Sequence, residues 1–325
     1  MIVITGGAGF IGSTLANSLK DQELIIIDTF TNNLQKDNLL FNDGNIRLVN
    51  LADSKEILDL YKHKIKYFYH FGANSSTDQS IIEETINLNI FWSQYYWDFC
   101  SLNAIPFMYA SSAATYGDGS YGFSDQTSLK ELKEVKLNGL YGWSKMFFDF
   151  FAFNQSAKGR CPPKWYGLKF FNVYGENEKH KGSQSSVIHS FLKQISEQKK
   201  VYLFKSYKEG VLDGEQERDF VSANYCIEFI KNLSKLDCEN GIYNVGTGNS
   251  KTFLEFTKDI IDSTGVEVDI EFIEMPESLK QHYQYFTRSE NIKSKKIHAN
   301  ISQFDYKKDL DNIINNLHIP DDKGK

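Results

Sequence analysis

The sequence predicts an α/β fold built on a doubly wound parallel sheet, with a smaller C-terminal α/β lobe. A short apolar strand at residues 2–4 leads into a turn rich in glycine, and a helical pattern follows this turn. Strand and helix patterns then alternate as far as about residue 170, as they do in parallel sheets of the Rossmann type. A chain of 325 residues is also long enough to bury two cores.

The turn at residues 6–12 has the glycine spacing of a loop that holds a dinucleotide pyrophosphate, with Gly6, Gly9 and Gly12. Glycine lets the backbone turn tightly and approach the phosphates, whose charge is met by N–H groups at the start of the next helix. A second apolar strand at 24–27 ends in Asp28, whose carboxylate can accept hydrogen bonds from the adenosine ribose. Such a glycine string alone is a weak signal, but here the flanking elements occur in the expected order.

The remaining elements continue the alternation. Strands are expected at 46–50, 67–70, 107–112 and 165–170, helices at 55–63, 81–103 and from about Gly139, and loops at 29–45 and 118–138. Later helices are expected at 185–198, 222–235, 252–264 and 307–317, and extended segments at 202–205, 242–245 and 268–273. We expect a dinucleotide-binding domain at 1–175 and a substrate-binding lobe at 176–325, from which some chain crosses back.

The composition argues against several classes of protein. The net charge is −6 and no basic block is present, so a nucleic-acid surface is not expected. No apolar run approaches the ~20 residues of a membrane span, and no signal peptide is visible. The seven His lack metal-ligand spacing, so no metal is expected. Cys100, Cys161, Cys226 and Cys238 show no CxxC or disulfide pattern, which indicates reduced thiols and a cytoplasmic protein.

Tyr141 and Lys145 form the candidate catalytic pair. They are four residues apart on an expected helix, so both side chains lie on one face. A tyrosine is a poor base at neutral pH, but a neighbouring ammonium favours the phenolate and lowers its pKa. Tyr141 could then act as a general base. Ser112, at the end of the expected strand 107–112, would hydrogen-bond the substrate hydroxyl or the ketone formed from it.

A glycine turn, a serine at a strand end and YxxxK, in this order, resemble the short-chain dehydrogenase/reductase superfamily. The GGxGxxG and YGxSK forms in this chain are similar to those of its extended branch, whose members act on nucleotide sugars. The resemblance implies a nicotinamide cofactor, with Lys145 also holding the nicotinamide ribose. It further implies a homo-oligomer, because helices usually pack between subunits in this superfamily.

Further motifs narrow the resemblance. They are FGANSST at 71–77, YASSAATYG at 109–117, FNVYG at 171–175, HKGS at 180–183, ERDF at 217–220, YNVGTG at 243–248 and YQYFT at 283–287. Together they resemble the ADP-L-glycero-D-manno-heptose 6-epimerase family, from residue 1 to about residue 290. The most specific piece is 172–183, because it adds a lysine, Lys181, to the ordinary superfamily set.

The resemblance implies a reaction with two acid–base groups. Inverting a secondary alcohol removes a hydride to NADP⁺ and returns it to the opposite face of the planar ketone. One acid–base group cannot conveniently serve both faces, so Tyr141 would work on one face and Lys181 on the other, at C6 of the heptose. The cofactor is regenerated in each turnover and should stay bound. The product would supply lipopolysaccharide inner-core synthesis.

The family's binding residues carry over by position. The implied cofactor residues are Gly6, Gly9, Phe10, Ile11, Gly12, Asp28, Thr29, Lys36, Phe71, Gly72, Ala73, Asn74, Ser75, Asn89, Lys145, Val173 and Lys181. The implied substrate residues are Ser112, Asn172, Ser183, Ser190, Phe204, Lys205, Ser206, Tyr207, Arg218 and Tyr283. Among these, Asn172 and Ser183 would bind the sugar, 204–207 would line the nucleotide site, Arg218 would meet the pyrophosphate and Tyr283 would close the pocket.

The chain departs from the family pattern in several places. The loop 208–216 is longer than usual, the family's substrate-contacting histidine falls on Ser190, and a Lys-Gly-Arg motif is Lys-Gln-His at 280–282. A lysine near the second strand normally meets the 2′-phosphate of NADP. Lys36 lies near that place, whereas Asp28 alone would favour NAD; we expect NADP, with NAD as the alternative.

Other functions stay open on the sequence. One is a UDP-sugar 4-epimerase, against which Lys181 in its motif argues. Another is a nucleotide-sugar dehydratase. A dehydratase would carry an Asp-Glu pair after the serine strand, but residues 113–115 of this chain are Ala-Ala-Thr. A third is a non-catalytic dinucleotide-binding regulator, which would not need Ser112, Tyr141 and Lys145 together.

Overall fold

The computed structural model describes residues 1–325 apart from 41–44, 76–80, 138, 281–282, 302 and 318–325, and it leaves out the side chains of residues 183 and 278. The last two residues of the FGANSST motif, Ser76 and Thr77, and positions 281–282 of the Lys-Gln-His motif therefore lie outside the described residues.

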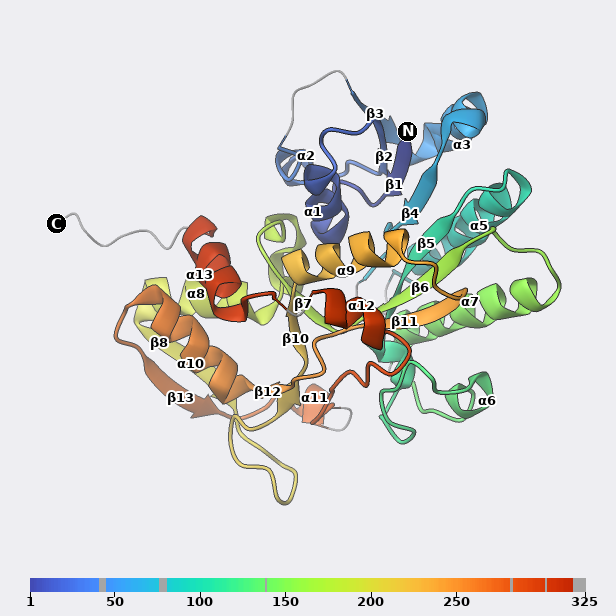
Figure 1. The fold of residues 1–325 in the computed structure, drawn as a ribbon. Helices are drawn as coiled ribbons and strands as arrows, with labels where there is room; N and C mark the ends of the chain where they lie inside the picture. The colour runs from blue at the N-terminus through green and yellow to red at the C-terminus, as the bar shows by residue number, and fades with distance from the viewer. Residues whose placement is uncertain (41–44, 76–80, 138, 281–282, 302, 318–325) are drawn as a thin grey trace.

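Within the described residues, a seven-stranded parallel sheet forms the centre of the molecule (Figure 1). Its strands are β1 (Ile2–Thr5), β2 (Leu24–Asp28), β3 (Ile46–Asn50), β4 (Tyr67–His70), β5 (Phe107–Ser112), β6 (Trp165–Phe170) and β11 (Gly241–Val245). They lie side by side in the order β11-β6-β5-β4-β1-β2-β3. The doubly wound sheet predicted from the sequence is confirmed, and the predicted bounds of β3, β4, β5 and β6 agree residue for residue.

The chain order reverses at β1. This strand pairs with β2 on one side and with β4 on the other, so that Thr5 lies opposite both Ile27 and His70. In open parallel sheets, ligands bind at the carboxyl ends of the strands where the order reverses. The glycine turn leaves β1 at this edge, and the Gly6 N–H donates to the Ile27 carbonyl at 2.8 Å.

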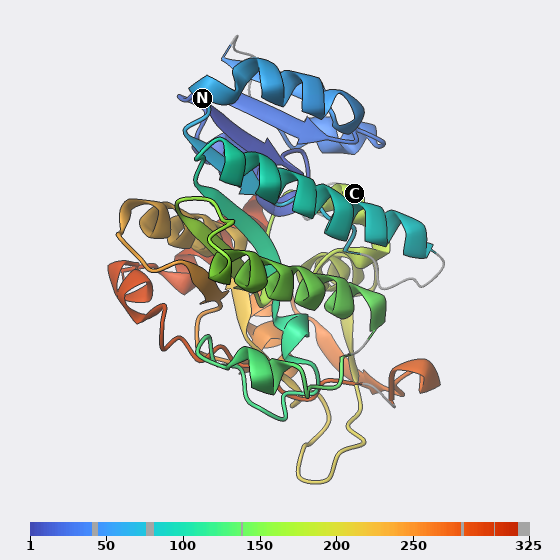
Figure 2. The same cartoon turned by 90° about the vertical axis from the view of Figure 1, so that its right-hand side faces the viewer.

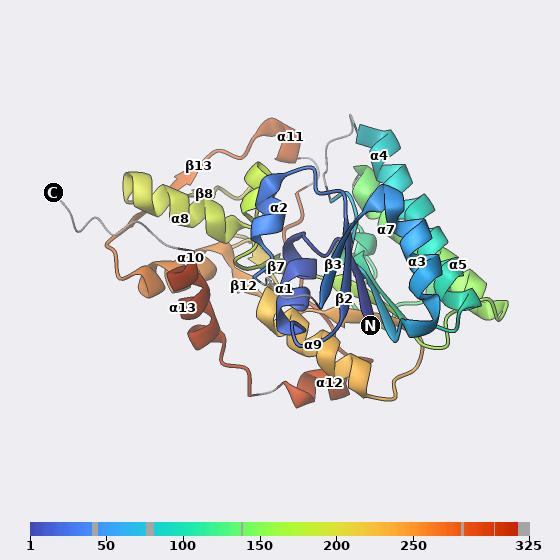
Figure 3. The ribbon, with the colours of Figure 1, turned by 90° about the horizontal axis from the view of Figure 1, so that it is seen from above.

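Helices cover both faces of the sheet. One face carries α3 (Ser54–Tyr61), α4 (Ile82–Ile86), α5 (Ser93–Leu102) and α7 (Gly139–Ala157); the other carries α1 (Phe10–Ser18), α9 (Ala223–Lys235) and α12 (Lys295–Asn300). Figure 2 faces the layer of α3, α5 and α7, and Figure 3 shows the two layers from above. A π-helical segment, Asn87–Trp92, joins α4 to α5, so the helix expected over 81–103 is present with one wider turn.

Alternate strand residues bury their side chains under opposite layers. Val3 and Ile25 pack in the core that contains Trp97 of α5, whereas Ile4 and Ile26 pack in the core that contains Leu15 of α1. Because both faces are covered, every residue of β2 is buried. This explains why β2 is a continuous apolar run as far as Asp28.

A second core lies beyond β7 (Asn172–Tyr174). It is formed by α8 (Val187–Gln198), α10 (Phe253–Thr264) and α13 (Tyr306–Asn316) over the parallel pair β8 (Lys200–Phe204) and β13 (Asp269–Ile273). The short pairs β7–β10 (Phe220–Ser222) and β9 (Glu217–Arg218)–β12 (Lys251–Thr252) lie between the two cores (Figure 1). The chain returns to the main sheet at β11 and to its helical layer at α9 and α12.

Several short elements occur where the sequence predicts loops or gives no clear pattern. Helix α2 (Asn33–Asp37) lies in the expected loop 29–45, and α6 (Leu129–Leu132) lies in the expected loop 118–138. Both begin with a capping box, from Asn32 to Gln35 and from Ser128 to Glu131. This signal was present in the sequence, but helices of four or five residues show no periodicity. Helix α11 (Glu277–Lys280) is equally short.

Among the described helices, none combines the length and the apolar character needed to cross a membrane.

Replacing Gly12 tests the glycine turn. A Cβ at this position would lie 2.1 Å from the Gly6 carbonyl oxygen, so the turn must shift. We expect Gly12→Ala to lower the unfolding free energy by about 1–3 kcal/mol and to abolish most of the dinucleotide affinity, measured by thermal unfolding and titration. Ser18→Ala on the same helix, at an exposed position, is the matched control. Wild-type dinucleotide affinity in Gly12→Ala would show that the turn does not hold the pyrophosphate.

Candidate active site

A cavity of about 640 Å³ lies at the carboxyl ends of the central strands, where the chain order reverses. It runs from the glycine turn, past the loop after β4 and the end of β5, to the segment Lys179–Gln184. The predicted residues that line it are Gly6, Gly9, Phe10, Ile11, Gly12, Asp28, Thr29, Phe71, Gly72, Ala73, Asn74, Ser75, Ser112, Tyr141, Lys145, Val173 and Lys181. The structure thus brings all the residues with an expected acid–base or hydrogen-bonding role in catalysis to one cavity.

One end of the cavity suits the pyrophosphate and ribose of a dinucleotide. The backbone at Gly6 and Gly12 approaches so closely that a side chain on either would meet other backbone atoms. Helix α1 starts at Phe10 with no acidic residue in its first turn, so its N–H groups are open to an anion. The Asp28 carboxylate accepts from the Ala8 N–H at 3.0 Å and faces the same cavity. These residues fit a dinucleotide.

Asn89 and Lys36 do not line the cavity. Asn89 is buried behind it, where its side chain donates to the Asn74 carbonyl at 2.9 Å and accepts from the Asn74 N–H at 2.8 Å. It therefore shapes the loop after β4 from outside. Lys36 is exposed on α2, and its ammonium lies 5.9 Å from the Phe30 ring centroid.

Ser112, Tyr141 and Lys145 meet at the end of β5. The Lys145 ammonium donates to the Ala110 carbonyl at 2.8 Å and lies 6.0 Å from the Tyr141 ring centroid. Burial raises the pKa of Tyr141, and a hydrogen bond with the Ser112 side chain opposes this rise. The Lys145 ammonium is directed at the Ala110 carbonyl, and the lowering of the Tyr141 pKa by Lys145 that the sequence predicts stays a prediction. Burial lowers the pKa of Lys145 to about 8, and the Asp149 carboxylate opposes this fall.

A buried charge network supports this corner and was not predicted. Asp149, one helical turn after Lys145, accepts from Tyr109 at 2.9 Å and from Ser111 at 2.8 Å, and pairs with Lys169 at 3.6 Å. Burial raises the pKa of the Asp149 carboxyl, and the Lys169 ammonium opposes this rise. The spacing of Lys145 and Asp149 could have indicated a contact on one helix face, but nothing in the sequence marks Asp149 as buried.

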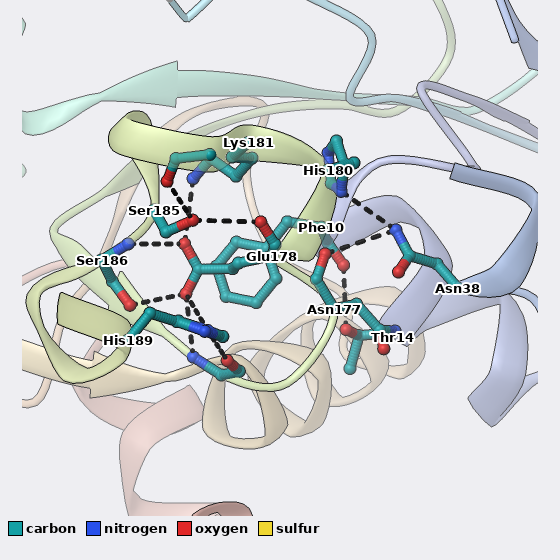
Figure 4. A network of polar contacts seen from close by, with 12 residues as sticks. Phe10, Thr14, Asn38, Asn177, Glu178, His180, Lys181, Ser185, Ser186 and His189 are labelled. Carbon is teal, nitrogen blue, oxygen red and sulfur yellow. Dashed lines mark hydrogen bonds and ion pairs between the residues drawn. The ribbon is translucent and has the colours of Figure 1, made fainter. Parts of the chain in front are cut away.

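Lys181 reaches the cavity from a different segment, Lys179–Gln184. Its ammonium pairs with the buried Glu178 carboxylate at 3.1 Å and lies 5.1 Å from the Phe10 ring centroid (Figure 4). Glu178 lies inside the most specific sequence motif but was not predicted to have a role. Ion pairs between residues i and i+3 are common on protein surfaces, but the Glu178 carboxylate of this pair is fully buried.

Most of the predicted substrate residues lie elsewhere. Apart from Ser112, none of those whose side chains are described lines the cavity, and the side chain of Ser183 lies outside the description. Arg218 and Tyr283 do meet, with the guanidinium carbon 5.3 Å from the ring centroid. Ser190 is exposed on α8 and accepts from Gln194 at 3.0 Å.

The segment 204–207 is held by neighbours of the second core. Lys205 pairs with Glu274 at 2.8 Å, and the Tyr207 hydroxyl donates to the same carboxylate. The Tyr207 N–H donates to the Tyr285 hydroxyl at 3.0 Å. The last of these contacts places Tyr207 beside Tyr285, in the chain segment that follows Tyr283.

In the part of the chain that the structure describes, no three His, Cys, Asp or Glu side chains gather as ligands for a metal ion.

The buried Lys145 ammonium makes stability depend on pH. Its pKa is about 8 in the folded protein against 10.5 for the unperturbed group, so the unfolded chain binds this proton more tightly. The contribution of Lys145 to stability therefore rises with pH between these values. From about pH 6.5 to about pH 9.5, we expect the wild type to gain about 2 kcal/mol of unfolding free energy relative to Lys145→Met, measured in urea. The exposed Lys193→Met is the control; a gap between wild type and Lys145→Met that does not change with pH would contradict the expected titration.

Comparison with known proteins agrees with the resemblance seen in the sequence. A family model described as the NAD dependent epimerase/dehydratase family matches residues 2–246. An ADP-L-glycero-D-manno-heptose-6-epimerase of Fusobacterium nucleatum subsp. nucleatum is 36% identical over 314 residues, which cover 91% of this chain and 92% of the relative. One of Nitratidesulfovibrio vulgaris strain Hildenborough is 35% identical over 298 residues, 89% of each chain.

A crystal structure of the Helicobacter pylori ADP-L-glycero-D-manno-heptose-6-epimerase superimposes with a TM-score of 0.78 and 24% identity, over 98% of this chain and 96% of that one. This likeness supports the fold. The sequence relatives and the family model identify the protein more closely: the chain belongs to the NAD dependent epimerase/dehydratase family and, within it, to the ADP-L-glycero-D-manno-heptose-6-epimerases, isomerases that work with a nicotinamide dinucleotide.

Proposed function

We propose that this enzyme inverts C6 of ADP-D-glycero-D-manno-heptose to give ADP-L-glycero-D-manno-heptose, by transient oxidation to a ketone and re-reduction. The product would serve lipopolysaccharide core biosynthesis. The observation that carries the proposal is that Tyr141 and Lys181, from separate segments, line the same cavity as the glycine turn.

The chain's own residues supply the proton chemistry. A bound nicotinamide would take the hydride with its electron pair from C6 and return it to the same carbon. As the C6 hydride leaves, the hydroxyl O–H bond breaks and its proton passes to the Tyr141 phenolate or to the Lys181 amine. As the hydride returns, the protonated partner on the other face gives its proton to the ketone oxygen. Ser112, already hydrogen-bonded to Tyr141, holds the oxygen in place.

Arg218 supports a substrate with a pyrophosphate. Its side chain is 8% exposed, yet in the described residues no carboxylate forms an ion pair with it. Its guanidinium carbon lies 5.5 Å from the Phe253 ring centroid and 5.3 Å from the Tyr283 ring centroid, and the guanidinium donates to the Glu217 carbonyl at 2.8 Å. A buried guanidinium without an acidic partner is costly unless an anion binds it. The ADP portion of the substrate would supply that anion.

The most direct test is incubation with ADP-D-glycero-D-manno-heptose, with the C6 configuration followed by NMR. We expect conversion to a mixture of both epimers. Tyr141→Phe removes the hydroxyl that carries the proton, and we expect turnover to fall by about 10²–10⁴-fold. An unchanged substrate pool with the cofactor-loaded wild type would overturn the assignment.

The same experiment separates the alternatives. A UDP-sugar 4-epimerase would leave ADP-heptose untouched and invert C4 of a UDP-hexose. A dehydratase would release water and give a deoxy-keto sugar. A non-catalytic regulator would bind the dinucleotide and turn over none of these substrates.

We propose NADP as the preferred cofactor. The Asp28 carboxylate already accepts hydrogen bonds from the Ala8 N–H at 3.0 Å and from Gln35 at 3.3 Å, which offset part of its charge. Lys36 is the next residue after Gln35 on α2 and is exposed, so its long side chain can turn toward a 2′-phosphate.

This cofactor preference can be measured by titrating the enzyme with NADP and with NAD. We expect wild type to bind NADP more tightly, and Lys36→Met to weaken NADP binding about tenfold while leaving NAD unchanged. Lys20→Met, at another exposed lysine, is the control. Tighter binding of NAD by the wild type would mean that Asp28 decides the preference.

The proposal also covers the oligomeric state of the enzyme and the cellular compartment in which it works. Phe91, Trp143 and Phe147 expose large apolar side chains on the π-helical segment and α7, which supports a homo-oligomer that covers them. The four cysteines are all free thiols, which supports a reducing, cytoplasmic setting.

A further inference from the structure

Glu178 is a fully buried carboxylate next to the cavity, and no role has been assigned to it. It lies in the turn between β7 and the segment Lys179–Gln184. A buried carboxylate is costly unless hydrogen bonds and a cation compensate for its lost hydration. Its contacts therefore indicate what it does.

Three contacts fix the position of the carboxylate itself. Oε1 accepts from the Gly175 N–H at 3.2 Å and from the Ser186 hydroxyl at 2.5 Å, and Oε2 accepts from the Ser186 N–H at 2.8 Å (Figure 4). Two of these donors belong to the backbone, so they do not depend on any flexible side chain. The Glu178 carboxylate is thus held in place before any ligand binds.

The cation beside this carboxylate is Lys181. Its ammonium donates to Oε2 at 3.1 Å, and on another side it lies 5.1 Å from the Phe10 ring centroid. His189 also lies at the carboxylate, with Nε2 3.6 Å from Oε1 and 2.7 Å from the Gly175 carbonyl. Phe10 belongs to the first turn of α1, so Lys181 is held against the element that follows the glycine turn.

We infer that Glu178 is a positioning residue, whose carboxylate holds the Lys181 ammonium at the cavity wall so that Lys181 can exchange a proton with one face of the sugar ketone. A lysine on a four-carbon stem, 23% exposed here, would otherwise sample solvent and lose the geometry that proton transfer needs. This inference rests on the proposed function, because it requires Lys181 to act as an acid–base group.

The test starts the reaction from each epimer separately and follows the absorbance of the reduced nicotinamide after rapid mixing with the cofactor-loaded enzyme. In the wild type, both epimers should reduce the bound cofactor. In Lys181→Met, one epimer should react about 10²–10⁴-fold more slowly while the other keeps its rate, because Lys181 serves one face. We expect Glu178→Gln to slow the same epimer at least tenfold and to spare the other. Glu178→Asp, which keeps the charge on a shorter stem, should recover part of this loss.

Two controls separate positioning from general damage. Because both epimers react with the same preparation, the ratio of their rates is independent of the fraction that is folded. Glu228→Gln removes another Glu–Lys pair of i,i+3 spacing, with Lys231 on α9, and should leave both rates unchanged. In the double variant Glu178→Gln/Lys181→Met, the loss of Glu178 should cost nothing further, because it acts through Lys181.

Equal slowing of both epimers in Glu178→Gln, or wild-type rates for both, would overturn the inference while Lys181→Met still supports the proposed function. Further slowing in the double variant would also overturn it, since Glu178 would then act independently of Lys181. If neither epimer reduces the cofactor in the wild type, the proposed function fails, and the inference fails with it.

Discussion

Buried positive charge is the constraint on which the site depends. Lys145, Lys169 and Arg218 are each less than 9% exposed, and Lys181 lies at the wall of the same cavity as Lys145. The carboxylates that form ion pairs with lysines here are Asp149, for Lys169, and Glu178, for Lys181. The Arg218 guanidinium has no such partner among the described residues. Burying these cations lowers the stability of the folded protein in water, and anionic ligands that bind the cations offset part of this loss.

The fold places this charge where the ligands would lie. The reversal of strand order at β1 opens the cavity at the carboxyl ends of β1, β4 and β5. The helical layer then supplies Tyr141 and Lys145 on α7, while the segment after β7 supplies Lys181. The Asp149 carboxylate acts electrostatically on Lys145 in the first group, and the Glu178 carboxylate forms an ion pair with Lys181 in the second. The proposed acid–base groups therefore lie in separate elements, each beside its own polar network, which suits the proposed reaction, in which a proton leaves the C6 hydroxyl on one side of the sugar carbon and returns to the ketone oxygen from the other side.

The sequence predicted most of the fold and part of the site, for physical reasons. Strands β4 to β6 are largely buried and rich in apolar and aromatic residues, so they could be bounded to the residue. The edge strand β3 is mostly exposed and was bounded by its short apolar segment. The glycine turn, Ser112, Tyr141, Lys145 and Lys181 belong to motifs with fixed spacing, and the structure brings them to one cavity. Strands of two or three residues, such as β9 and β12, carry no periodicity and were missed.

The features that the sequence could not predict depend on which side chains are buried and on where those side chains point. Asp149 and Glu178 are ordinary acidic residues until their environment is known, and the direction of the Lys145 ammonium toward Ala110 is invisible in its spacing from Tyr141. The place of Arg218 beside Tyr283, outside the cavity that holds Tyr141, depends on how the two cores pack.

The central claim is that one hydride leaves a sugar carbon and returns to the same carbon from the other side. Substrate that carries deuterium at C6 tests it directly, with the inverted product analysed by NMR and mass spectrometry after reaction in ordinary water. The account predicts that the product keeps the deuterium at C6 and gains no solvent hydrogen there. Loss of the deuterium to solvent would instead show inversion by removal of a proton from C6, and would contradict the account.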